Sequence, residues 1–246
     1  MASITGKAGY VTKQVSGVDT VVDAVREWSI DYVTDVIDIT EFLETAPTHK
    51  STMTVLKSAT ASFIGNHTDG DTGLDLGTSY NMLLVADASR AFYGAAIVNS
   101  KSPSVAVTGE ATMTYNITFN GYVYVMGANL VVNGTFATDA SWDKGTDWTI
   151  PEDNTAVVDG QGAAGNLEAS SDPLSATTKY FTQYTISAFT DGSIIIDVGT
   201  TDGTSRTATG TYTEIITSGG DGTLVFTPSV SATLKIGTVI VREILN

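Results

Sequence analysis

The stretch AVREWSIDYVTDVIDITEFL, residues 24–43, decides how the rest of this chain is interpreted. A helix over these residues would align one stripe at three- and four-residue spacing, formed by Trp28, Tyr32, Val36, Ile39 and Leu43. Against a helix, the stretch is rich in β-branched residues, which are stiff in helices and suit a pleated sheet. No capping box or glycine stop frames it either. We therefore predict a long β-strand.

This strand has an apolar side and an acidic side. Trp28, Ile30 and Tyr32 share the first side, and Glu27, Asp31 and Asp35 share the second. The alternation then shifts, since Ile37 and Ile39 are odd-numbered where the earlier apolar residues are even-numbered. A bulge or bend near residues 34–35 accounts for this change of phase.

Composition excludes several classes of protein. The chain has 246 residues, no cysteine and a net charge of -15, so disulfide and thiol chemistry are excluded. No cluster of Lys and Arg exists, which argues against tight nucleic-acid binding. The longest apolar runs are far shorter than a spanning helix needs, and the first ten residues lack the apolar core of a signal peptide. We expect no membrane insertion.

Strand-like alternation continues along the chain. Its strongest example is residues 111–125, where Met113, Tyr115, Ile117 and Phe119 alternate with polar residues, and which we predict to pair with residues 105–107. Residues 44–57 read as a long polar loop, and residues 87–90 as a weak helical turn. Further strands are predicted as follows: 10–15, 18–25, 58–65, 80–86, 91–98, 155–158, 179–189, 193–198, 211–216, 222–227 and 232–241.

A change of texture near residues 127–128 indicates two domains. Gly, Asp and Thr become more frequent beyond it, and turn signals such as Asp191-Gly192 and Asp202-Gly203 separate the later strands. We predict an all-β chain with one β-sandwich over residues 1–127 and a second, jelly-roll β-sandwich over residues 128–246.

Motifs that carry chemistry are weak. His49 and His67 lie in polar loops, and no nucleophile elbow accompanies them, so we expect no catalytic triad. GQGAAG (residues 160–165) precedes no helix, and residues 69–80 lack the Gly and Glu of a calcium loop. We therefore predict no enzyme activity, no cofactor and no metal site.

Aromatic residues leave one alternative open. Trp142, Trp148 and Tyr184 could form a platform that stacks on sugars, or they could be core anchors of a small sandwich.

Four segments of the first half together resemble the tail tube (major tail) protein of long-tailed bacteriophages. They are SITGKAGYVT, EWSIDYVTDVIDIT, LKSATASFIG and SVAVTGEATMTYNITFNGYVYV, and the resemblance covers nearly all of residues 1–126. It implies a β-sandwich whose copies form hexameric rings, which stack into a tube that conducts DNA without binding it specifically. The implied partners are other copies of the chain and the tape-measure, distal-tail and terminator proteins. The implied location is the virion tail, after assembly in the host cytoplasm.

The same resemblance suggests roles for residues. The long loop after the central strand would bridge successive rings, with Phe42, Glu44, Thr48, His49, Lys50 and Met53 as candidate contacts. Glu27, Asp31 and Asp35 are candidates for the lumen, because carboxylates repel phosphates and let a duplex slide. Ordinary solvated polarity explains these carboxylates equally well.

Residues 129–246 resemble the carbohydrate-binding-like jelly-roll modules that are often appended to phage and secreted proteins. The segments that carry this resemblance are NLVVNGTF, KYFTQYTISAFT, GTYTEIITSGGDGTLVFTPS and IGTVIVREI. Gly237 and Thr238 replace the Asp-Asn pair of that family's last motif, which argues against its structural calcium. The resemblance implies an outward-projecting module that either contacts host-surface glycans or serves only as a decoration. The alternative function is a carbohydrate-binding protein that forms no tube.

Overall fold

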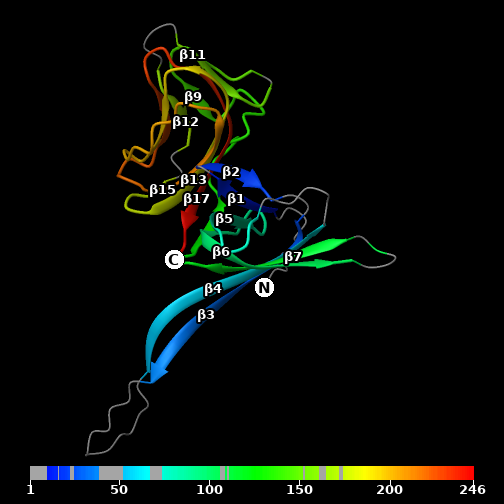
Figure 1. The fold of residues 1–246 in the computed structure, drawn as a ribbon. Helices are drawn as coiled ribbons and strands as arrows, with labels where there is room; N and C mark the ends of the chain where they lie inside the picture. The colour runs from blue at the N-terminus through cyan, green and yellow to red at the C-terminus, as the bar shows by residue number, and fades with distance from the viewer. Residues whose placement is uncertain are drawn as a thin grey trace, which may run out of the picture. The chain divides into compact units, whose positions relative to one another are not determined.

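The structure is a computed structural model, and every regular element in its described part is a β-strand (Figure 1). It describes residues 10–15, 17–22, 25–38, 52–66, 74–105, 109, 111–151, 153–160, 165–171 and 174–246, with only the backbone described at 33–38, 52–58 and 66. The prediction of an all-β chain is confirmed for these residues. None of them forms a helix with the length and apolar character needed to cross a bilayer.

The chain divides into two compact units, and each is considered by itself. Unit 1 contains Val21–Val85 and Phe92–Tyr124, together with the start of the chain up to Lys13. Unit 2 contains Val125–Asn246 and two short earlier segments, Gln14–Thr20 and Ala86–Ala91. The sequence gives no sign of the two earlier segments.

Unit 1 is built on strands in the order β3-β4-β7-β6-β5-β1, of which β3, β4, β7 and β6 pair antiparallel. Its strands are β1 (Tyr10–Val15), β3 (Val25–Asp38), β4 (Thr52–Asn66), β5 (Ser79–Val85), β6 (Ala91–Ser104) and β7 (Thr112–Phe119), whereas most of β2 (Val18–Val21) belongs to a segment of unit 2.

Strict alternation creates the core of this unit. In β7, Met113, Tyr115, Ile117 and Phe119 are buried, while the residues between them are partly or fully exposed. Phe63 of β4 stacks on Tyr115 with the ring centroids 5.0 Å apart. These side chains join apolar residues of β1, β5 and β6 in one cluster, so the sheet encloses a single core on one of its sides.

The central stretch forms β3 and pairs with β4 from Val25 to Asp38. The register of this pairing shifts between Asp35 and Val36, which confirms the predicted bulge near residues 34–35. A second shift lies between Val25 and Glu27.

Three local predictions in unit 1 are wrong. Residues 52–57 of the predicted loop 44–57 belong to a strand, because β4 begins at Thr52 and pairs with the end of β3. The predicted arm 111–125 is two strands, since Gly121 turns the chain with φ +114° between β7 and β8 (Tyr124–Asn129). The partner predicted at 105–107 is instead β6, which runs on to Ser104.

The helical turn predicted at residues 87–90 is also wrong. Asp87 uses one carboxylate oxygen to accept hydrogen bonds from the backbone N–H groups of Ser89 at 2.7 Å and Arg90 at 2.9 Å. A short polar side chain that binds the backbone in this way makes a tight turn rather than a helix. A hydrogen bond from the Ser89 hydroxyl, together with these backbone ones, lowers the pKa of the Asp87 carboxyl.

Unit 2 is a β-sandwich of two antiparallel sheets. One sheet runs β10-β11-β17-β13-β15, with β8 also paired to β17, and the other runs β14-β16-β12-β9. The strands are β9 (Trp142–Lys144), β10 (Trp148–Thr149), β11 (Ala156–Asp159), β12 (Leu167–Ala169), β13 (Lys179–Asp191), β14 (Ile194–Val198), β15 (Gly210–Thr217), β16 (Leu224–Pro228) and β17 (Thr233–Ile244).

The two sheets of unit 2 meet in an apolar core. Tyr184 of β13 lies edge-on to Phe226 of β16, with the ring centroids 5.3 Å apart, and the two strands belong to opposite sheets. An ion pair between Arg206 and Glu214, 2.7 Å long, ties the turn-rich segment after β14 to β15. The contact between the sheets is therefore apolar, with aliphatic and aromatic side chains together, and a largely buried ion pair accompanies it.

Polar contacts fasten the two early segments to unit 2. The Asp19 carboxylate accepts hydrogen bonds from Thr213 and from Gln183, the latter at 2.9 Å. Arg242, a buried residue of β17, donates to the carbonyl oxygens of Ala88 at 3.1 Å and Gly127 at 2.7 Å. Burial raises the pKa of the Asp19 carboxyl above its ordinary value.

Candidate functional site

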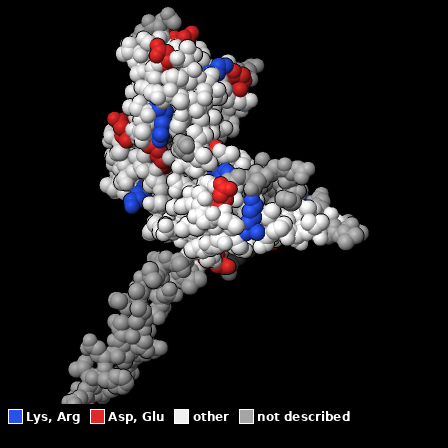
Figure 2. Space-filling model, viewed as in Figure 1, with Lys and Arg blue, Asp and Glu red and all other residues white. Residues whose placement is uncertain are grey.

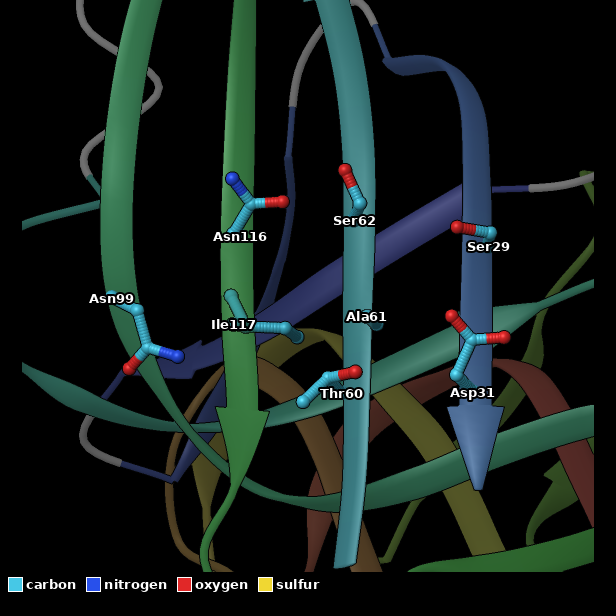
Figure 3. A pocket seen from close by; sticks show the side chains of 8 residues that line it. All are labelled: Ser29, Asp31, Thr60, Ala61, Ser62, Asn99, Asn116 and Ile117. Atoms are coloured by element: carbon cyan, nitrogen blue, oxygen red, sulfur yellow. The ribbon is translucent and has the colours of Figure 1, made fainter. Parts of the chain in front are cut away.

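The side of the unit 1 sheet that faces away from the core is polar. Figure 3 shows its side chains projecting from four neighbouring strands, β3, β4, β7 and β6. We call this surface the polar face and define it by Ser29, Asp31, Thr60, Ser62, Asn99 and Asn116, which line a shallow depression of about 200 Å³. Sheet pairing brings them together, since Ser29 is opposite Ser62 and Asp31 is opposite Thr60.

Hydroxyl and amide groups dominate the chemistry of the polar face. Asn116 donates a hydrogen bond to the Ser100 hydroxyl at 2.7 Å, and Asn99 donates to the Thr118 hydroxyl. Asp31 supplies the carboxylate of the depression, and none of its lining residues is a cation or a histidine. Such a surface binds water well but holds no nucleophile–base pair and no cation to grip a phosphate.

The structure places the predicted acidic candidates as follows. Glu27 and Asp31 are exposed, and Asp31 lies on the polar face, so neither carboxylate points into the core. Asp35 pairs with Leu56 through its backbone, and its side chain lies outside the described residues. The role of these carboxylates in a lumen stays a prediction.

Sequence reasoning missed most of the polar face. Ser29, Thr60, Ser62, Asn99 and Asn116 come from four strands, and only the pairing register shows that they are neighbours. The signal that could have found them was the alternation itself, because the residues between buried positions of β4 and β7 must share the opposite side.

Charged residues on the view of Figure 2 give no basic surface. The Lys and Arg side chains drawn there do not gather into a patch, and several of them lie beside Asp or Glu side chains. Among the described residues, no three or more His, Asp or Glu side chains lie close enough together to hold a metal ion.

Beyond the sheet, β3 and β4 continue as a two-stranded arm (Figure 1). β4 pairs with β7 only from Thr60 to Asn66, whereas its pairing with β3 extends on to Thr52 opposite Asp38. We call residues 33–38 and 52–58 the arm. In the described part of the chain, the outer backbone groups of both arm strands have no third strand beside them.

The predicted inter-ring contacts fall at or beyond the end of this arm. Met53 lies in β4 opposite Ile37, so its assignment to a loop was wrong. Its pairing with the end of β3 makes it part of the arm. Phe42, Glu44, Thr48, His49 and Lys50 lie outside the described residues.

The aromatic residues considered for glycan contact are buried in unit 2. Trp142 is 4% exposed, Trp148 is 5% exposed and Tyr184 is fully buried. Each indole donates a hydrogen bond inward, from Trp142 to the Asn133 carbonyl at 3.1 Å and from Trp148 to the Gly165 carbonyl at 2.7 Å. A buried ring cannot stack on a sugar, and the geometry therefore favours the core-anchor interpretation.

Within the described part of unit 2, the exposed large hydrophobic side chains are Val15, Val132, Val230 and Leu245, and none of them is aromatic.

The chain is thus an all-β protein with a polar sheet face and a projecting two-stranded arm. No protein-family model and no curated protein sequence matches it. It is similar to a chain in the C6-symmetric tail of an empty GTA particle, with 17% identity, a TM-score of 0.41, and coverage of 49% of this chain and 97% of that one.

Two further solved structures are similar. One is a chain of the native gene transfer agent (GTA) virion, with 16% identity, a TM-score of 0.41, and coverage of 50% of this chain and 98% of that one. The other is the SPP1 Dit (gp 19.1) protein, described as a hub adsorption apparatus of phages that infect Gram-positive hosts, with 11% identity, a TM-score of 0.27, and coverage of 97% and 100%. Similarity at this level assigns no function to the chain.

Proposed function

We propose that this chain is a structural protein of a phage tail, the tube subunit, whose copies assemble into stacked hexameric rings around a DNA channel. The observation that carries the proposal is the arm. A two-stranded hairpin is only marginally stable in water, and its open backbone edges favour pairing with another chain. Residues 33–38 and 52–58 therefore suit a strand-pairing contact with a neighbouring copy.

Ring assembly would also use pairing between open strand edges. A heterologous contact, in which one surface of a subunit meets a different surface of the next, closes into a ring when the rotation fits. β3 stands at one end of the unit 1 sheet, so each subunit has an open strand edge to offer in the described structure.

The polar face supports the conduit part of the proposal. A channel for DNA must hydrate the duplex and must not hold its phosphates. Hydroxyl and amide groups with the Asp31 carboxylate, and no cation lining the depression, meet that requirement. In the assembled tube, the polar face would line the lumen, with Glu27 beside it.

Unit 2 would project outward as an appended module. The competing function, a carbohydrate-binding protein without tube assembly, loses its main support because Trp142, Trp148 and Tyr184 are buried. Glycan contact by this unit would require other residues.

Shortening the arm tests the proposal. Replacing residues 36–55 by Asn-Gly, the preferred two-residue hairpin turn, joins Asp35 directly to its partner Leu56 and keeps the rest of the β3–β4 pairing. We expect a subunit with the circular dichroism of the unaltered protein that forms no tubes in negative-stain micrographs. Tubes of normal length from the shortened chain would refute the role of the arm.

A further inference from the structure

The chain contains two Asn-Gly dipeptides close together, Asn120-Gly121 and Asn133-Gly134. Asparagine before glycine is prone to deamidation, because the unhindered glycine nitrogen can reach the asparagine side chain. The reaction also requires that the side-chain amide and the glycine nitrogen be free to approach each other. The two sites differ sharply in this respect.

Asn120 is free in the folded chain. It follows the last residue of β7, its side chain is exposed, and its amide makes no hydrogen bond with the described residues. Its own backbone N–H is bonded to the Ala95 carbonyl at 2.7 Å, which holds the residue in place without restraining the side chain. Gly121 has φ +114° and no atom within 4 Å of the position that a Cβ would take.

Asn133 is restrained on every side. Its amide nitrogen donates to the carbonyl oxygens of Thr138 at 2.7 Å and Ala140 at 2.8 Å, and its amide oxygen accepts from the Ala137 N–H at 3.0 Å. Gly134 is buried, and a Cβ there would overlap the backbone oxygen of Val239. The amide cannot turn toward the glycine nitrogen without breaking all three hydrogen bonds.

We propose that Asn120 is a site of spontaneous deamidation in the folded protein and that Asn133 is protected from it. The Gly121 nitrogen attacks Cγ of Asn120, the new C–N bond closes a succinimide, and the Cγ–Nδ2 bond breaks. The side-chain nitrogen leaves as ammonia with the proton lost by Gly121. Water then opens the ring at either carbonyl and leaves aspartate or isoaspartate at position 120.

The product changes the end of β7 chemically. Either product adds one negative charge to a chain whose net charge is already -15. The isoaspartate form also inserts one extra backbone carbon beside the hydrogen bond between Asn120 and Ala95, at the turn that leads to β8. Unit 1 is therefore expected to accumulate aspartate and isoaspartate at this turn with time.

Peptide mapping of the intact chain tests the proposal. Full-length protein is incubated for days at mildly alkaline pH, in buffer and in parallel in guanidinium chloride. Chymotrypsin then cleaves between the two sites, for example after Tyr124, and mass spectrometry measures the amide-to-acid mass change in each peptide. Asn120→Gln serves as the matched variant, because glutamine at this position closes a larger ring far more slowly.

In buffer, the peptide with Asn120 should convert roughly tenfold or more faster than the peptide with Asn133, since the latter must first lose its three hydrogen bonds. In guanidinium chloride, the two rates should become similar. Equal rates in buffer, or no conversion of Asn120 in buffer while it converts in guanidinium chloride, would overturn the proposal. Conversion that persists unchanged in the Asn120→Gln variant would overturn it as well.

Discussion

Replacing Trp142 by alanine gives a direct measure of what this residue does. Its ring lies 5.1 Å from Phe136 and 6.2 Å from Phe226, measured between centroids, and its indole N–H donates to the Asn133 carbonyl. With 4% of the residue exposed, almost the whole side chain would be replaced by a cavity. Trp→Ala substitutions in cores cost about 3–5 kcal/mol, and we expect Trp142→Ala to cost about 4 kcal/mol.

Urea unfolding followed by far-ultraviolet circular dichroism provides the assay. At a typical dependence on urea, a loss of about 4 kcal/mol lowers the unfolding midpoint of unit 2 by about 2 M. The matched control is Val132→Ala in the same unit, whose side chain is 58% exposed and whose loss should change stability by less than about 0.5 kcal/mol.

The result separates the core anchor from the sugar platform. A platform residue would be lost at little cost in stability, since it would face solvent. A cost below about 1 kcal/mol for Trp142→Ala would therefore contradict the core assignment and reopen the carbohydrate-binding function.

Three further predictions concern individual contacts. Glu214→Gln removes the charge that pairs with Arg206 at 2.7 Å, in side chains only 13% and 21% exposed, and should cost about 1–2 kcal/mol in urea unfolding. Burial raises the pKa of the Asp19 carboxyl, so the folded state holds its proton more tightly than the unfolded state and this group's contribution to stability falls as pH rises through the folded pKa. Asp19→Asn should thus stabilise the protein at neutral pH, with a gain that shrinks at mildly acidic pH. Gly134→Ala should lower the free energy of unfolding by more than about 2 kcal/mol, or prevent the protein from being recovered in soluble form. Gly220→Ala, where a Cβ meets nothing within 4 Å, should leave the free energy of unfolding nearly unchanged.

Each of these has a contrary result. For Glu214→Gln, the contrary result is a urea-unfolding midpoint that changes as little as the midpoint of the Glu243→Gln variant. Glu243 is an exposed residue of β17 and serves as the control. For Asp19→Asn, it is a stability difference that stays the same between neutral and mildly acidic pH. For Gly134→Ala, it is stability equal to that of Gly220→Ala.

Much of the fold was predictable because burial on one side of a sheet imposes alternation. Residues 113–119 alternate without exception, and the change of phase after Tyr32 located the bulge at Asp35–Val36 correctly. The start of β4 at Thr52 was missed because the sequence before Ser58 shows no clear period and therefore reads as a loop.

The remainder depended on information that lies far apart in the sequence. Strands β9, β10 and β12 are only two or three residues long, too short for a period to show. The polar face needs the pairing register of β3, β4, β7 and β6 before its members become neighbours. Whether Trp142 and Trp148 are buried or exposed depends on which sheet covers them, and an aromatic residue looks the same in either case.

The central claim, that the polar face lines the channel of an assembled tube, is tested most directly by a cryo-electron microscopy reconstruction of the purified protein after assembly. We predict stacked rings in which Asp31 and Asn116 face the channel and the arm, residues 33–38 and 52–58, pairs with another subunit. A reconstruction with the polar face on the tube exterior, or a protein that stays monomeric under every assembly condition, would contradict the account.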